Sequence, residues 1–287
     1  MRGKIREDSM GLRINTNIES LVAQHRLGKT RSELEQTQYK LSSGSRIVSS
    51  KDDAAGLAIS ENLRSAMRCT GQNIKNAQNG FFLLQTAEGA LNEITNITIR
   101  MKELAVQASS DTNGDKERGY LDNEYQSLKQ ELDRISATTL FNGRQLLQAG
   151  SGDSEINIQV GPNNSPERDR VLVASNFNVT LSSLGLADFE IATSDGARES
   201  LEPMEMALDQ ISKIRGQIGA AESRLQTTIN NLGIYEESMT GAFSQIRDAD
   251  MAVETSQFAK QNILSQAGVA VLAQANAAPQ LALKLLG

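Results

Sequence analysis

Few residues of this chain have side chains and spacing that could do chemistry. The 287-residue sequence contains one histidine, His25, and one cysteine, Cys69. A multi-histidine metal site and an intrachain disulfide are therefore excluded, and no catalytic triad can be assembled around either residue. Both are interpreted as ordinary helix residues.

The adjacent acids Asp52 and Asp53 are the next candidates for chemistry. Paired carboxylates can serve acid–base catalysis, but no base or nucleophile motif accompanies these two. They directly precede an Ala-rich segment, where an Asp can cap free N–H groups and suits the positive end of a helix. Gly44 is interpreted as a turn, because the sequence has no GxxxxGK[ST] phosphate loop. We therefore expect no enzyme, no cofactor and no metal.

Composition predicts long helices rather than an ordinary globule. Aromatic residues make up 4% of the chain, Trp is absent, and proline occurs only at Pro162, Pro166, Pro203 and Pro279. A core with so few rings must be a narrow aliphatic seam between helices. The net charge of −6, without a basic block, argues against nucleic-acid binding. There is no apolar run long enough to span a membrane and no cleavable secretory signal, so export would need a route that does not read one.

Apolar residues recur at seven-residue intervals in three stretches, which predicts long helices in a coiled-coil-like bundle. The turn-forming segment 110–119 should reverse the chain between two antiparallel helices. The three series are Met204, Ile211, Ile218, Leu225, Leu232, Met239, Ile246 and Val253; Ala77, Leu84, Leu91 and Ala105 with Ala87, Ile94, Met101 and Ala108; and Leu121, Tyr125, Leu128, Leu132 and Ile135.

The heptads disappear between Phe141 and about Pro203. Alternating Ile156, Ile158 and Val160, followed by Gly161-Pro162-Asn163-Asn164, predict a strand and a turn. The segments 171–173 and 177–181 look like further strand material. The expected fold is mostly α: a long antiparallel helical bundle with a small β-hairpin tip, and with the termini paired in a second helical layer.

The two ends of the chain carry apolar seams of their own. The apolar surface of the C-terminal segment exceeds what an N-terminal partner helix could cover, so we expect neighbouring copies to share it. The expected polymerisation residues are Ile14, Ile18, Leu21, Leu27, Leu34, Leu41, Leu264, Val271, Ala278 and Leu285.

Several segments resemble the bacterial flagellins, over about 10–165 and 200–287. They are MGLRINTN (10–17), LSSGSRI (41–47), SKDDAAGLAI (50–59), TAEGAL (86–91), ELAVQA (103–108), FNG (141–143), IRDADMA (246–252) and the Ala-rich final helix. The short stretch 165–200 suggests a minimal flagellin without the large variable outer domains.

The resemblance implies a non-enzymatic subunit of the extracellular flagellar filament, exported unfolded and polymerised into a helical tube for motility. Its implied partners are copies of itself, the flagellar export apparatus and its chaperone, and the filament cap and hook-junction proteins. The inner tube would be formed by residues 10–45 with 250–287. The outer helical arm would be formed by 46–140 with 200–249, and the β-containing tip by 141–199. Residues 1–9 lack a counterpart in the family and are expected to be a non-native or disordered extension, with Met10 as the true start.

The resemblance also implies recognition by a toll-like receptor. The segment 100–106 resembles the family's recognition segment, with Lys102 where Arg is common. Arg100, Leu104 and Glu124 would be the central contacts. Alternatively, Glu103 and Leu104 are only helix-surface or subunit-contact residues.

Two other functions stay open at this point. A hook–filament junction protein shares the terminal helices, and abundance in sheared filaments would separate it from a flagellin. A coiled-coil adaptor would explain the heptads but not the apolar seams at both ends.

Overall fold

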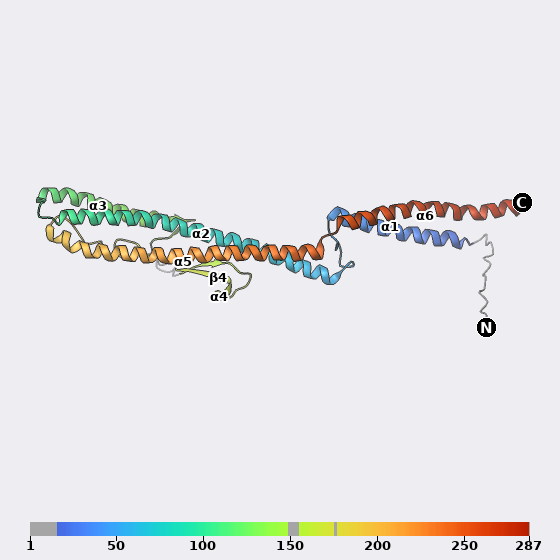
Figure 1. Ribbon diagram of the computed structural model, residues 1–287, viewed down its shortest axis with the longest axis horizontal. Coiled ribbons are helices and arrows are strands. Elements are labelled where there is room, and N and C mark those ends of the chain that lie inside the picture. Colours follow the sequence, from blue (N-terminus) through green and yellow to red (C-terminus); the bar gives the residue numbers. More distant parts are fainter. Residues whose placement is uncertain (1–15, 149–154, 175–176, 287) are drawn as a thin grey trace. The chain divides into compact units, whose positions relative to one another are not determined.

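The computed structural model describes residues 16–148, 155–174 and 177–286, with the backbone alone at 155, 173–174 and 278–286. The chain forms two compact units, each described by itself. The terminal unit contains residues 1–64 and 240–287, and the central unit contains residues 65–239 (Figure 1). The expected extension at 1–9 lies outside the described residues.

The terminal unit contains a pair of antiparallel helices, α1 (Ile18–Ser43) and α6 (Met251–Leu286), which lie side by side (Figure 1). The side chain of Asn17 caps α1 by accepting a hydrogen bond from the Ser20 amide at 3.0 Å. Gly44 ends the helix with a φ of 68°, a left-handed conformation that glycine adopts without strain. The predicted turn at Gly44 is confirmed.

The central unit is a bundle of α2 (Ala54–Ala108), α3 (Asp115–Thr138) and α5 (Ser194–Arg247). The predicted heptads supply its core, which confirms the mostly α, antiparallel fold. Fully buried residues of these heptads, with no exposed surface, are Ala77, Leu84, Ala87, Leu91, Ile94, Met101, Ala105, Ala108, Tyr125, Leu132, Met204, Ile211, Ile218 and Leu225.

A buried arginine stabilises the reversal between α2 and α3. Arg118 donates through Nε to the carbonyl of Ala108 at 3.0 Å and through Nη2 to that of Ser110 at 3.2 Å. Its cation thus lies at the negative C-terminal end of α2. The turn itself is shorter than predicted, because α3 already begins at Asp115, whose carboxylate pairs with Arg118 at 3.1 Å.

Two small antiparallel sheets interrupt the helices. In the first, β1 (Leu140–Phe141) pairs with β2 (Arg144–Gln145), and the turn residues Asn142 and Gly143 both have positive φ angles, 51° and 80°. Asn-Gly favours such two-residue hairpin turns. In the second, β3 (Glu155–Gln159) pairs with β4 (Arg170–Ala174), with the short helix α4 (Pro166–Asp169) between them. The strands predicted at 156–160 and 171–173 are thereby confirmed.

The β3–β4 hairpin packs on the side of the bundle (Figure 1). Asn76 of α2 donates to the carbonyl of Gln159 at 3.2 Å, and Ile158 lies over Gly80 of α2. The sequence did not specify this placement.

The strand predicted at 177–181 is wrong. Phe177 and Val179 are buried, but the segment has no strand structure. Asn178 accepts hydrogen bonds from the amide and hydroxyl of Thr180 through its side chain, and its carbonyl accepts one from Ser183 Oγ. Such local side-chain bonds compete with sheet pairing.

The limits of α5 also differ from the heptad pattern. The helix begins at Ser194 and continues through Pro203, because Ala197, Ser200 and Met204 are buried against the core. It ends at Arg247, so the series that was extended to Val253 crosses a break before α6.

Candidate functional site

The contact between α1 and α6 is polar. Thr37 Oγ1 lies 2.8 Å from Gln261 Oε1, and Ser20 Oγ lies 2.7 Å from Asn276 Oδ1. Lys40 and Glu254 form an ion pair at 3.7 Å. Ser20 and Thr37 are the buried residues of α1. Polar and small side chains thus make much of this contact, beside the half-buried Leu27, Leu34 and Leu41.

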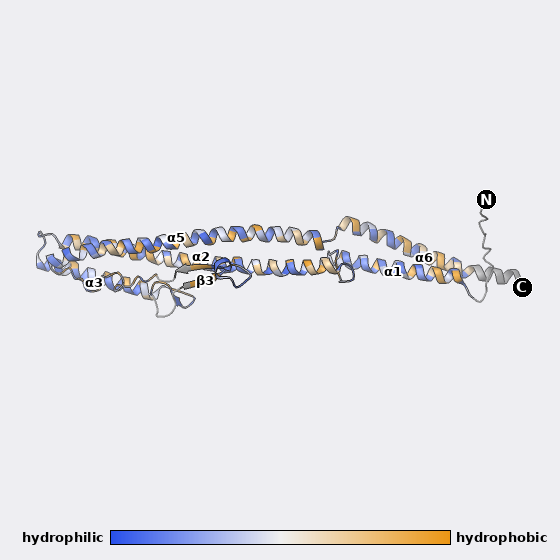
Figure 2. Cartoon of the chain, turned by 90° about the horizontal axis from the view of Figure 1, so that it is seen from below, coloured by the Kyte–Doolittle hydropathy of each residue, from blue (hydrophilic) through white to orange (hydrophobic). Residues whose placement is uncertain are grey.

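The large apolar side chains of the same two helices are directed to the outside, and Figure 2 shows hydrophobic residues along α6. Ten of them expose 47% or more of their surface. Soluble monomers seldom leave so much apolar surface uncovered, and exposed apolar patches typically mark interaction sites. These residues are Ile18, Leu21, Val22 and Tyr39 of α1 and Met251, Val253, Ile263, Leu264, Val269 and Val271 of α6.

An apolar groove with a volume of about 670 Å³ runs between α1 and α6. Its apolar lining includes Ile18, Val22, Leu27, Leu264, Gly268 and Val271. A Cβ atom at Gly268 would lie 3.1 Å from Leu27 Cδ1, so the glycine permits the close approach of the helices at this point.

The predicted seam residues thus separate into two groups. Ile18, Leu21, Leu264 and Val271 are exposed, whereas Leu27, Leu34 and Leu41 are half-buried. Ile14 and the side chains of Ala278 and Leu285 lie outside the described residues.

Sequence reasoning missed the polar residues inside the pair. Thr37 lies three residues after Leu34 and four before Leu41, which is the position of a polar residue within a heptad seam. That spacing could have identified it.

In the terminal unit, the segment that follows α1 is hydrogen-bonded to the segment that precedes α6. The amide of Arg46 donates to the carbonyl of Arg247 at 2.6 Å, and the amide of Ala249 donates to that of Gly44 at 2.9 Å. The Arg247 side chain also donates to Glu61, and this bond holds the pKa of the Glu61 carboxyl below its usual range.

Asp52 and Asp53 both stabilise local backbone. Asp52 accepts from the amides of Ser49 and Val48 at 2.9 and 3.2 Å, and the Ser49 bond is the main cause that lowers the pKa of Asp52. Asp53 Oδ1 accepts from the amide of Gly56 at 2.8 Å, which caps α2. These contacts favour the capping interpretation.

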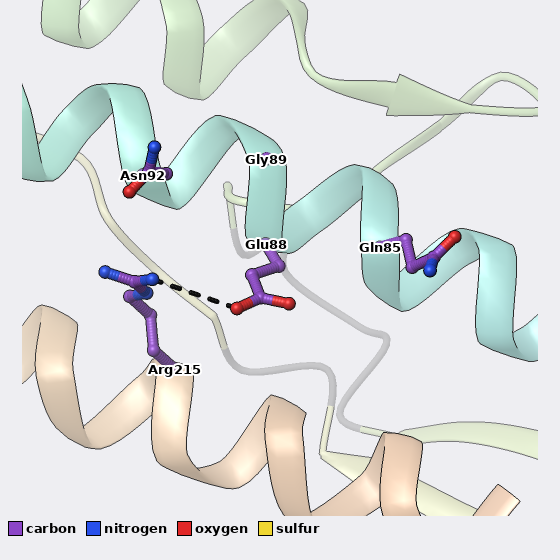
Figure 3. Close-up of a pocket in the computed structure, with 5 residues that line it drawn as sticks. All are labelled: Gln85, Glu88, Gly89, Asn92 and Arg215. Carbon is purple, nitrogen blue, oxygen red and sulfur yellow. Dashed lines mark ion pairs between the residues drawn. The ribbon is translucent and has the colours of Figure 1, made fainter. Parts of the chain in front are cut away.

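A shallow polar pocket of about 360 Å³, which no sequence pattern predicted, lies between α2 and α5 (Figure 3). Glu88 and Arg215 pair across it at 3.8 Å, with Gln85 and Asn92 on the α2 side. Nearby Glu222 has one carboxylate oxygen buried without a hydrogen-bond partner. Burial, followed by the charge of Glu88, raises the pKa of Glu222.

The residues of the expected receptor segment do not share one surface. Arg100 pairs with Glu124 at 2.9 Å and with Glu103 at 3.0 Å, and all three are exposed. Leu104, in contrast, has no exposed surface. A direct contact through the Leu104 side chain is thus not available, because the heptad turns this residue into the core of the bundle.

Within the described residues, no three His, Cys, Asp or Glu side chains form a group that could hold a metal ion, and no helix is long and apolar enough to cross a membrane. A helical bundle whose terminal pair carries its apolar side chains outward defines a structural subunit that associates with other chains.

Comparison with known proteins identifies the class of subunit. Residues 14–151 match the bacterial flagellin N-terminal helical region, and residues 201–286 match the C-terminal helical region. The chain is 40% identical to a flagellin of Halalkalibacterium halodurans, covering 95% of this chain and 99% of the relative, and 39% identical to a flagellin of Bacillus subtilis, covering 96% and 100%. The 33 kDa flagellar filament core protein of Treponema phagedenis is 35% identical, covering 95% and 99%.

The chain belongs to the flagellin family. Among solved structures, a Bacillus cereus flagellin is 29% identical with a TM-score of 0.49, over 55% of this chain and 88% of that one. The protein is accordingly a structural subunit of the extracellular bacterial flagellar filament, and its small size fits a minimal flagellin.

Proposed function

We propose that the outward apolar surface of the α1–α6 pair is the surface through which copies of the chain polymerise. The observation that supports this proposal is the inverted arrangement of the pair, with Thr37 and Gln261 between the helices and Leu264 and Val271 outside. Burying one such side chain fully against a neighbour stabilises the contact by roughly 1.5–3 kcal/mol. Several of them per copy can offset the loss of freedom on association.

The same arrangement supports export of the chain unfolded, with folding of the ends completed in the polymer. A helix pair whose contact is largely polar has little to stabilise it alone, so its ends open at low free-energy cost. The export apparatus, its chaperone, the filament cap and the hook-junction proteins are the proposed partners along this route. A catalytic role is not part of the proposal, since the acids Asp52 and Asp53 serve backbone capping.

Deletion of residues 270–287 tests the proposed surface. The truncated chain should remain a soluble helical monomer by circular dichroism and should form no filaments in negative-stain images. Filaments built by the truncated chain would overturn the proposal.

Val271→Asp is a gentler test, because Val271 is 58% exposed in the single chain. The monomer should fold normally, whereas burial of an unpaired charge between copies costs on the order of 3–5 kcal/mol. Filaments of normal number and length would mean that Val271 is not buried between subunits.

Recognition by a toll-like receptor is a second proposed function. It is supported by the exposed Arg100–Glu124 pair on α2 and α3, which presents both charges on one surface. Receptor signalling should be measured with the monomer and with an Arg100→Ala/Glu124→Ala variant. An unchanged response from the variant, or no response to the unaltered monomer, contradicts this proposal.

A further inference from the structure

Helix α6 carries apolar residues on two different sides. Successive residues of an α-helix turn by about 100°, so Leu264 and Val271 lie within about 20° of each other. Both are exposed and both line the groove. We call the side formed by Leu264, Gly268 and Val271 the groove flank.

The second side is formed by Met251, Phe258 and Val269, which we call the ridge flank. By the same turn per residue, Met251 and Val269 share one direction and Phe258 lies within about 20° of it. Met251 is 52% exposed, Val269 is 49% exposed, and Phe258 is half-exposed. None of the three lines the groove.

Helix α1 lies between the two flanks. Gln261, which contacts Thr37 of α1, is about 60° from Leu264 and about 80° from Val269 on the helix. Leu264 and Val269 are consequently about 140° apart, with the partner helix separating them. The α1 helix of the same copy therefore leaves Leu264, Val271 and Val269 exposed.

Little charge opposes burial of the two flanks. The sequence has no charged residue from Gln261 to Leu283, the range that contains Leu264, Gly268, Val269 and Val271. The charged residues that line the groove, Glu19 and Arg26, come from α1 and have opposite signs. The groove is concave, while the ridge flank carries the ring of Phe258 and the unbranched side chain of Met251, which adapts to irregular gaps.

We infer that the groove flank of one copy receives the ridge flank of the next copy. This inference rests on the proposed function and specifies how that surface is used. A contact between two different patches of the same chain leaves one of each patch free at the ends, so it repeats without closing. A contact of groove with groove would instead stop at a pair of chains.

Two matched variants of the full chain test the inference. Leu264→Asp disables the groove flank and Val269→Asp disables the ridge flank, with nearly equal exposure at the two positions, 47% and 49%. Gln130→Asp, at an exposed polar position on α3 outside the proposed surface, is the control for added charge. Filament mass is measured by sedimentation and electron microscopy, and complexes by analytical ultracentrifugation, for each variant alone and for an equal mixture.

Each Asp variant of α6 should lose filament mass more than tenfold, while Gln130→Asp stays within twofold of the unaltered chain. The mixture should form one-to-one complexes, because the intact ridge of one variant fits the intact groove of the other, but it should form no filaments.

Other outcomes separate the two proposals. The groove-to-ridge contact alone is overturned by either of two results. In the first, Val269→Asp assembles normally while Leu264→Asp loses its filaments. In the second, both variants lose their filaments and their mixture forms no complex. Normal assembly by both variants overturns the proposed polymerisation surface as well.

Discussion

Ile158 of the β3–β4 hairpin lies so close to Gly80 of α2 that a Cβ atom at Gly80 would be 2.3 Å from Ile158 Cδ1. The hairpin therefore packs over a position where the helix has no side chain. The hydrogen bond from Asn76 to the carbonyl of Gln159 joins the hairpin to the same helix.

Gly80→Ala should lower the free energy of unfolding. Overpacking costs about 1–3 kcal/mol, of which the better helix propensity of Ala offsets about 1 kcal/mol. Gly89→Ala on the same helix has no heavy atom within 4 Å and should instead stabilise by about 0.5–1 kcal/mol. Urea unfolding of both variants measures the difference. A second change, Ile158→Val, should recover part of the loss at Gly80, and equal effects of the two glycine variants would contradict the close packing.

Lys129 should be required to hold the segment before α5 against α3. Its buried ammonium donates to the carbonyls of Ala187 at 2.7 Å and Phe189 at 3.1 Å and lies 5.8 Å from the Tyr125 ring centre. Lys129→Met leaves both carbonyls without this donor, which costs roughly 1–3 kcal/mol. Hydrogen exchange should accelerate at 186–191, whereas Lys102→Met, which breaks a surface ion pair, should change stability by less than about 0.5 kcal/mol. An unchanged rate of hydrogen exchange at 186–191 would contradict this prediction.

Glu222 should make stability depend on pH. Its pKa is raised in the folded chain, chiefly by burial and also by Glu88, from an ordinary value of 4.5. The charged form is therefore disfavoured by folding: the destabilisation is fully present above the folded pKa and disappears as pH falls toward 4.5. Glu222→Gln should raise the free energy of unfolding at pH 7, by less than about 1 kcal/mol because solvent screens the partly exposed group, and the gain should shrink toward pH 4.5. A gain that is equal at both pH values would contradict the assignment.

The heptad pattern predicted the central bundle well because one face of each helix had to be buried. Leu84, Ile94 and Leu225, chosen by spacing alone, are fully buried. The pattern could not predict where α5 begins, since Ala197 and Ser200 are small residues whose burial depends on partners distant in the sequence. The same limit applies to Leu104: the resemblance suggested a contact residue, whereas its heptad neighbours Met101 and Ala108 share its burial.

The terminal apolar surface was predicted from hydrophobicity alone. The structure adds the reason why its side chains face outward. Seven-residue spacing at Leu264 and Val271 did not distinguish a seam facing α1 from a surface facing outward. That distinction depends on Thr37 and Ser20, because hydroxyl groups that bond Gln261 and Asn276 orient the helices with their polar sides together. The polar pocket at Glu88 and Arg215 could not be predicted, as it requires the alignment of α2 with α5.

The register of α1 against α6 can be tested by a designed crosslink. A Cβ atom at Gly268 would lie 3.9 Å from the Cβ of Leu27, within the usual 3.5–4.5 Å for a disulfide. Leu27→Cys/Gly268→Cys, in a Cys69→Ser background, should therefore form an intrachain disulfide on mild oxidation, detected by altered gel mobility and by mass after digestion. Leu21→Cys/Gly268→Cys is the matched control, because residue 21 lies nearly two helical turns from residue 27. This pair should crosslink at least tenfold more slowly, since two cysteines beyond the allowed separation can be joined only if the backbone moves. Equal crosslinking of the two pairs would mean that the helices slide past each other, and then the polar contacts of Thr37 and Ser20 would not fix the surface that the pair presents to its neighbours.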